Sequence, residues 1–189
     1  MQEISLNILD IAQNSIRAQA TLIEIVIEEN PSADLFAFVI KDNGCGMDEE
    51  LLKKVSDPFV TTRTTRKVGM GISLLKAAAQ QTGGNIHIDS TLGKGTSIRA
   101  DFSYSHIDRQ PLGDIAAVMV SLISMNPDID FLYTHRYTQK DFVLDTRELR
   151  QILGDEVGLN EISVAQWIGE YINNNLAEIY GGAEYEKYS

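Results

Sequence analysis

The stretch from Lys41 to Met47 constrains the fold more than any other part of the chain, because it joins two elements through a turn with two glycines. Residues 35–40 are apolar and rich in aromatic and β-branched side chains, which predicts a strand. Residues 48–52 begin with three acidic side chains, which is typical of the first turn of a helix. We therefore expect a strand, a tight turn and a helix.

Asp42 stands at the end of the predicted strand, directly before the turn. A carboxylate accepts a hydrogen bond from an exocyclic amine, so Asp42 can select adenine over guanine, which carries a carbonyl at that place. Gly44 and Gly46 let the backbone approach a flat ligand closely. An ordinary Asp-Asn-Gly turn explains the same residues, so this stretch alone leaves both interpretations open.

The composition indicates a soluble globular chain of one large domain, or of one domain with an appendage. It has 189 residues, of which 43% are hydrophobic and 23% charged. No apolar run is long enough to cross a bilayer, and the single cysteine fits a reducing cytosol, so we expect a cytoplasmic location. The net charge of −11 argues against a broad nucleic-acid or anionic-membrane surface.

Residues 5–18 predict a mostly buried helix with one polar stripe. Asn7, Asp10, Asn14 and Arg17 recur at spacings of three and four, which places them on one side. A solvent-facing stripe is one interpretation. In the other the stripe faces a pocket, where Asn14 ligates Mg²⁺, Arg17 reaches a phosphate and Asp10 orients or activates water.

Alternating patterns predict two strand pairs. Residues 21–28 and 35–40 are expected to pair antiparallel, and residues 85–89 and 97–104 to form a hairpin around a glycine-rich turn. We place His87 on the face opposite its neighbouring isoleucines.

A basic, threonine-rich segment, residues 56–67, precedes the next helix at 72–81. It is either a mobile surface loop or a lid over phosphates, to which Lys67 would contribute. Gly69-Met70-Gly71 opens the helix, where backbone N–H groups bind anions and glycine permits close approach.

The pattern of predicted elements and motifs changes near residue 105. We expect helices at 114–125, 147–153 and 164–179, with a hairpin formed by 129–137 and 140–144. This part has no catalytic spacing, so residues 106–189 are interpreted as a smaller α+β extension of unknown role.

Together these stretches resemble the GHKL ATPases, which include DNA gyrase, the heat-shock chaperone ATPase, histidine kinases and MutL. The match covers roughly residues 4–104 and consists of five boxes in the family's order. The boxes are the asparagine box 9–18, the first glycine box 42–47, the phenylalanine box 57–62, the second glycine box 69–74 and the third glycine box 93–96.

The resemblance implies a two-layer α/β sandwich of the Bergerat type over residues 1–105, with ATP and Mg²⁺ as cofactors. It implies that Asp10 is catalytic and that Asn14 holds the Mg²⁺. The implied nucleotide-binding residues are Asn14, Arg17, Asp42, Gly44, Gly46, Met47, Thr61, Thr62, Lys67, Gly69, Met70, Gly71 and Thr96. Hydrolytic members usually carry glutamate at the position of Asp10, so the shorter side chain bears on hydrolysis more than on binding.

Three functions follow from this resemblance. The first is a Mg²⁺-dependent ATP-binding module that acts as a partner-dependent kinase or a slow ATPase, without histidine autophosphorylation. The second is a non-catalytic, ATP-dependent interaction switch. The third, a clamp on DNA, is disfavoured by the acidity. We expect an unidentified protein partner and no membrane, and a homodimer is left open.

Overall fold

The computed structural model describes residues 3–56, 70–154 and 156–181. A six-stranded mixed sheet has the strand order β3-β4-β2-β1-β5-β6. The strands are β1 (Leu22–Asn30), β2 (Leu35–Asp42), β3 (Asn85–Thr91), β4 (Gly95–Ser103), β5 (Asp130–Tyr137) and β6 (Lys140–Asp145). The helices are α1 (Ile4–Arg17), η1 (Pro31–Ala33), α2 (Glu49–Ser56), α3 (Met70–Gln81), α4 (Ile115–Met125), α5 (Thr146–Leu153) and α6 (Ile162–Tyr180).

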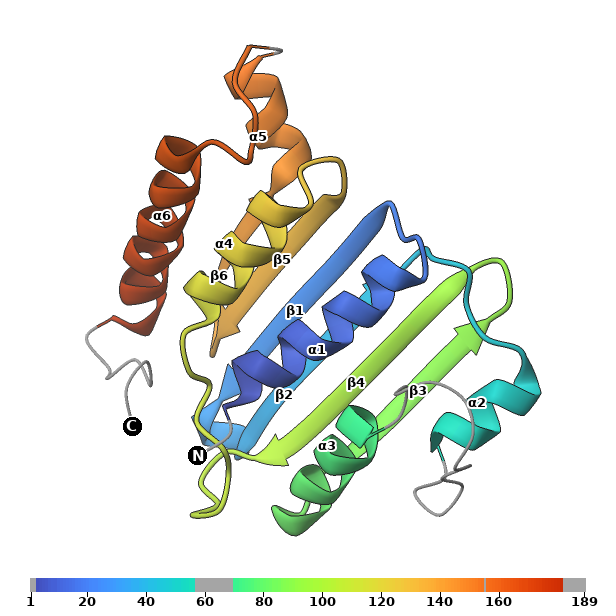
Figure 1. Cartoon of the computed structure of the whole chain (residues 1–189). Helices are drawn as coiled ribbons and strands as arrows, with labels where there is room; N and C mark the ends of the chain where they lie inside the picture. Colours follow the sequence, from blue (N-terminus) through green and yellow to red (C-terminus); the bar gives the residue numbers. More distant parts are fainter. Residues whose placement is uncertain (1–2, 57–69, 155, 182–189) are drawn as a thin grey trace.

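The strands alternate as their residues predict. β1 pairs antiparallel with β2, and β3 with β4, so both expected pairs are confirmed. In β1 every second side chain is buried, because helices cover one face of the sheet. His87 is exposed between two partly buried isoleucines, as expected. In Figure 1, α1, α3 and α4 lie in front of the sheet, which confirms the α/β sandwich.

The second part of the chain continues the same sheet. β5 pairs in parallel with β1, and β6 closes the expected hairpin against β5. α4 lies beside α1 and α6 beside α4. The boundary at residue 105 remains a prediction, but the sheet runs across it.

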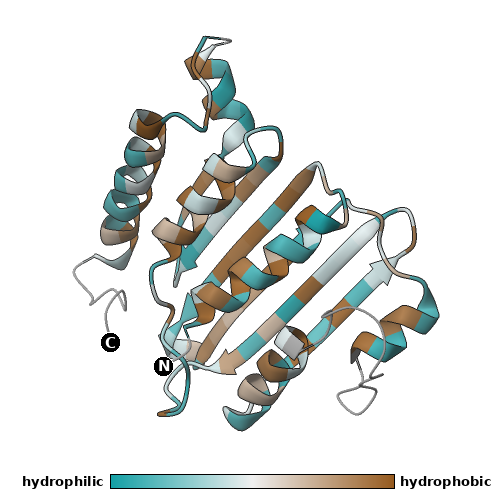
Figure 2. Cartoon of the chain, viewed as in Figure 1, coloured by the Kyte–Doolittle hydropathy of each residue, from teal (hydrophilic) through white to brown (hydrophobic). Residues whose placement is uncertain are grey.

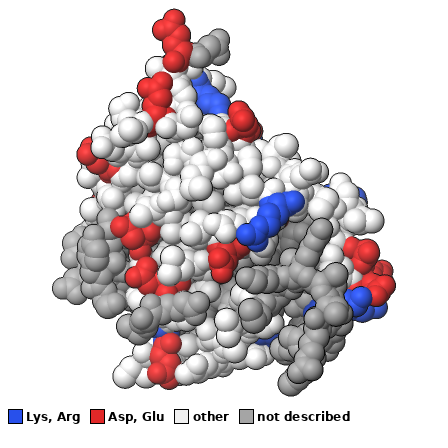
Figure 3. All heavy atoms as spheres, in the orientation of Figure 1, with Lys and Arg blue, Asp and Glu red and all other residues white. Residues whose placement is uncertain are grey.

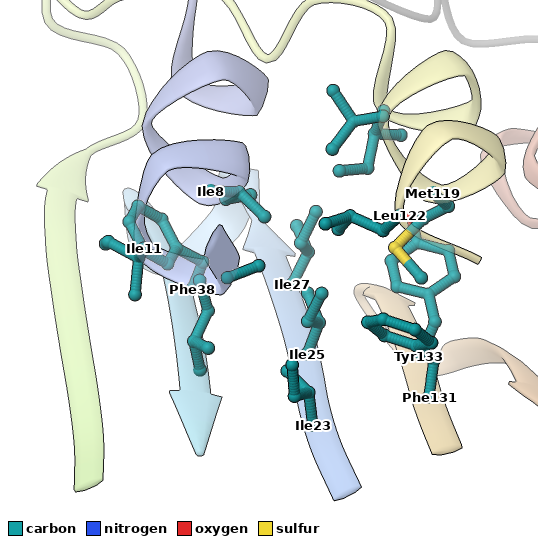
Figure 4. Close-up of a cluster of buried hydrophobic side chains, with 14 of the residues drawn as sticks. Ile8, Ile11, Ile23, Ile25, Ile27, Phe38, Met119, Leu122, Phe131 and Tyr133 are labelled. Atoms are coloured by element: carbon teal, nitrogen blue, oxygen red, sulfur yellow. The ribbon is translucent and has the colours of Figure 1, made fainter. Parts of the chain in front are cut away.

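The core is continuous from α1 to α4. Figure 4 shows the isoleucines of β1 between side chains of α1 and β2 and those of α4 and β5. Figure 2 shows β1 as largely hydrophobic, whereas α1 and α6 have mixed hydropathy. Ile8, Ile25 and Met119 are fully buried in this core. α1 is therefore fixed on its apolar side, which sets the direction of its polar stripe.

Candidate functional site

Asp42 is held at the end of β2 by three hydrogen bonds from three different elements. Its Oδ1 accepts from the backbone N–H of Gly44 at 2.9 Å and of Thr96 at 3.2 Å. Its Oδ2 accepts from the hydroxyl of Ser15, on α1, at 2.6 Å. The carboxylate is buried, so these donors compensate the cost of removing it from water. They also fix its orientation.

Two glycines allow the turns around Asp42 to close. Gly46 has φ +65°, and a Cβ there would stand 2.0 Å from the carbonyl oxygen of Thr91. Gly95 has φ +117°, and its Cβ would stand 1.9 Å from the carbonyl oxygen of Asp42. No side chain fits either position. These glycines are thus required by the packing of the two turns, whatever ligand approaches them.

Hydroxyl groups connect the two turns. Ser90 Oγ accepts from the backbone N–H of Met47 at 2.8 Å and lies 2.9 Å from Thr96 Oγ1. It also donates to the carbonyl oxygen of Gly95 at 3.1 Å. Met47 and Thr96, both predicted site residues, are therefore positioned together near Asp42 through Ser90.

The polar stripe of α1 lines an open cavity, in which Asp10 and Arg17 remain exposed to solvent. The cavity has a volume of about 130 Å³ and lies between α1 and the start of α3. Its lining residues are Asn7, Asp10, Ile11, Gln13, Asn14, Arg17, Gly71, Ile72 and Leu75. The structure thus brings Asp10, Asn14 and Arg17 together with Gly71. Asp42 does not line this cavity but is joined to it through Ser15, the neighbour of Asn14.

Within the stripe, Arg17 and Asn14 contact each other directly. Arg17 Nη1 donates to Asn14 Oδ1 at 3.0 Å. Asp10 forms no ion pair with Arg17 or with any other described residue. A Cβ on Gly71 would stand 3.6 Å from Asp10 Oδ2, so α3 starts close to this carboxylate. Asp10 is therefore an exposed carboxylate at the cavity that has no ion-pair partner in the described part of the chain.

Some predicted residues cannot be placed. Thr61, Thr62, Lys67 and Gly69, with the whole phenylalanine box, lie outside the described residues. Of Met70 only the backbone is described, as the first residue of α3.

Ser15 and Ser90 are missed by the sequence interpretation. Ser15 follows Asn14 directly, and its position one residue off the polar stripe is a signal that it faces a different group. Ser90 carries no such signal, because its role depends on the pairing of β3 with β4.

The described residues at the site offer few oxygen ligands for a metal ion. Among the residues that the structure describes, no cluster of three or more His, Cys, Asp or Glu can hold a metal ion. Mg²⁺ is commonly bound by one or two protein oxygens together with substrate phosphates and water. Asn14 Oδ1, at the cavity, is an oxygen of this kind.

Comparison with known proteins identifies the architecture. Residues 2–106 match the family described as histidine kinase-, DNA gyrase B- and HSP90-like ATPases. The chain is 40% identical over 70 residues to the sensor kinase CckA of Brucella abortus (strain 2308), a match that covers 36% of this chain. It is 33% identical over 102 residues to the sensor protein SrrB of Staphylococcus aureus (strain NCTC 8325 / PS 47), covering 51% of this chain.

These relatives are much longer than the region they share with this chain, since the matches cover 7% of the first and 17% of the second. A solved structure, the N-terminal domain of a DNA repair protein, shares the fold. It has a TM-score of 0.57 at 14% identity and covers 96% of this chain and 58% of that chain. No described helix is long and apolar enough to span a membrane.

Proposed function

Since the chain belongs to the family of histidine kinase-, DNA gyrase B- and HSP90-like ATPases, we propose that it binds Mg²⁺-ATP and transfers or releases the terminal phosphoryl group only slowly without a protein partner. The family match identifies residues 2–106 as an ATP-binding module of the histidine-kinase type. Magnesium dependence, the partner and the reaction belong to the proposal.

The observation that carries the proposal is the convergence of Asp10, Asn14 and Gly71 on one cavity. Asn14 would hold Mg²⁺ through Oδ1, and the backbone at the start of α3 would face the phosphates. Asp42, beyond Ser15, would receive the adenine amine. The nucleotide would then extend from Asp42 along α1 toward Asp10.

Asp10 is the residue that we assign to the reaction. It lies one helical turn before Asn14, so both side chains lean toward the same space. Phosphoryl transfer depends mainly on positioning and on charge stabilisation, and a carboxylate there orients water or an incoming hydroxyl. Aspartate reaches less far than the glutamate of hydrolytic family members, which supports slow turnover of the isolated chain.

Single-turnover phosphate release from labelled ATP tests this assignment. Asp10→Asn is expected to keep ATP affinity within about tenfold while lowering phosphate release by about a hundredfold or more. Asp128→Asn, on the turn after α4, is a matched control and should change neither quantity. Unchanged release from Asp10→Asn would contradict the catalytic role.

The contact between Arg17 and Asn14 favours a second candidate, a non-catalytic switch. Mg²⁺ bound to Asn14 Oδ1 would displace the guanidinium that now donates to that atom. Arg17 also lines a groove of about 200 Å³ between α1 and α4, so its displacement would alter that surface. ATP binding without any phosphate release, in the presence of the partner, would favour this candidate over the first.

A clamp on DNA is the least supported function. The chain carries a net charge of −11. On the face shown in Figure 3, the described Lys and Arg side chains lie apart from one another and form no continuous basic surface. Broad binding to a phosphate backbone depends on such a surface.

A further inference from the structure

Around Asp42 the site presents hydrogen-bond acceptors to a ligand, because the hydroxyl groups of Ser15 and Thr96 donate their hydrogens to other protein atoms. We infer that Ser15 is a specificity-determining residue, because it orients the Asp42 carboxylate so that a free acceptor position faces the ligand. The inference rests on the proposed function, since it assigns a role toward the adenine base.

The Asp42 carboxylate has room for one more hydrogen-bond donor. An ionised carboxylate offers about four lone-pair positions for hydrogen-bond donors. Among the described residues, Gly44 and Thr96 occupy two on Oδ1, and Ser15 occupies one on Oδ2. One position on Oδ2 is therefore left for a ligand. An exocyclic amine supplies the required donor, whereas a carbonyl oxygen would face a carboxylate oxygen.

The hydroxyl hydrogen of Ser15 is directed to Asp42. Ser15 is buried on α1, and its hydroxyl lies 2.6 Å from Asp42 Oδ2 but 3.5 Å from the carbonyl oxygen of Ile11. The short bond to a charged acceptor is much the stronger of the two. The hydroxyl hydrogen therefore points to Asp42 and is not available to a guanine carbonyl.

The hydroxyl groups of Thr96 and Ser90 are hydrogen-bonded to each other. Ser90 donates its only hydroxyl hydrogen to the carbonyl oxygen of Gly95. The contact of 2.9 Å between the two hydroxyl oxygens then requires Thr96 to donate to Ser90. The Thr96 hydrogen is thereby also directed into the protein. Ser15, Asp42 and Thr96 therefore all present lone pairs to the ligand. A base whose edge carries a hydrogen-bond donor, such as adenine, binds in preference to one that carries a carbonyl there.

The inference is tested by calorimetric titration of the full chain, with Mg²⁺, using three nucleotides. These are ATP, GTP and purine riboside triphosphate, which lacks the 6-amino group. In the Ser15→Ala variant, ATP affinity should fall by about tenfold, because one charge-assisted bond that orients Asp42 is lost. Affinity for purine riboside triphosphate should stay within about twofold, since it makes no bond to Asp42.

Ser5→Ala is the matched control, because Ser5 is an equally buried serine of α1 that donates to Glu3 instead. It should leave all three affinities unchanged. Ser90→Ala is a second variant that keeps Ser15 in place. It frees the Thr96 hydroxyl hydrogen, which can then donate to the guanine carbonyl. The ratio of ATP affinity to GTP affinity should therefore decrease.

Two results overturn the inference while leaving ATP binding intact. One is an equal loss for all three nucleotides in Ser15→Ala, which would mark Ser15 as merely structural. The other is an unchanged ATP affinity in that variant. If the unmutated chain binds none of the three nucleotides, the proposed function fails together with the inference, so the two failures are distinguishable.

Discussion

Two buried carboxylates occupy opposite ends of the same pair of strands, and their surroundings differ. Asp42 ends β2, opposite Ile23 of β1, whereas Glu29 lies near the end of β1, opposite Phe36. Asp42 receives its hydrogen bonds from a small hydroxyl and two backbone N–H groups. Glu29 is surrounded by ring side chains. The two carboxylates therefore differ in the size of the groups around them, which are small donors at Asp42 and rings at Glu29.

The Glu29 cluster links the first strand to the last helix. Glu29 Oε1 lies 2.9 Å from His135 Nε2 on β5 and accepts from the hydroxyl of Tyr180, the last residue of α6. His135 Nδ1 lies 2.6 Å from the hydroxyl of Tyr133. Glu29 retains only 2% of its accessible surface, and His135 none. Asp42, whose donors are smaller, retains 9% of its accessible surface.

The largest expected effect is on stability, from His135→Ala. His135→Ala removes one of the two described hydrogen-bonding partners of the buried Glu29 carboxylate, leaves Tyr180 as the other, and creates a cavity. The free energy of unfolding should therefore fall by about 3–5 kcal/mol. His87→Ala, at an exposed histidine of β3, should cost far less. Urea unfolding measures both changes. ATP affinity of folded His135→Ala should stay within about twofold; a large loss of affinity at unchanged stability would break the contrast between the two carboxylates.

Asp42→Asn should have the opposite effect to His135→Ala, with little change in stability and a change in nucleotide preference. The amide oxygen can still accept from Gly44 and Thr96 while the amide nitrogen donates to Ser15, so the fold should persist. A donor then faces the adenine amine, and ATP affinity should fall by about 1–3 kcal/mol while GTP affinity rises. Calorimetry with both nucleotides checks this. Equal losses for ATP and GTP would show that Asp42 does not read the base.

A third carboxylate, Asp145, gives the smallest effect. It caps α5 by accepting from the backbone N–H of Arg147, whose guanidinium lowers the pKa of Asp145 below the usual 3.8. A lowered pKa in the folded chain stabilises it above pH 3.8, and this contribution is lost as the pH falls from there toward the lowered value. Asp145→Asn should therefore cost about 0.5–1 kcal/mol at pH 7 and remove this pH dependence, as measured by urea unfolding at several pH values. If Asp145→Asn lowers the free energy of unfolding as much as His135→Ala does, burial among ring side chains is not the reason for the large effect at Glu29.

Local patterns were sufficient to predict much of the fold. The helices and strands follow from hydrophobic periods of about 3.6 and 2 residues, and the turn at Asp42 follows from its glycines. The stripe from Asn7 to Arg17 was predicted because its spacing is carried within one helix. That the stripe also lines a cavity depends on α3, which brings Gly71 close to Asp10, and could not be predicted from the stripe alone.

The remaining features depend on pairings between distant parts of the chain. Nothing local to residues 130–137 indicates that they lie parallel to β1, so the continuation of the sheet was not predictable. The same holds for the Glu29 cluster, where 106 residues separate Glu29 from His135. Ser90 belongs to this class through its bond from the backbone N–H of Met47, which is 43 residues away in the chain.

The most direct test of the central claim is a calorimetric titration of the unmutated chain with ATP and with GTP, each with and without Mg²⁺. In the proposed function, Asp42 would accept from the adenine amine and Asn14 would give one oxygen to Mg²⁺. We predict that ATP binds at least about tenfold more tightly than GTP and that removing Mg²⁺ weakens ATP binding. Equal affinity for the two nucleotides, or ATP affinity that does not depend on Mg²⁺, would contradict the account.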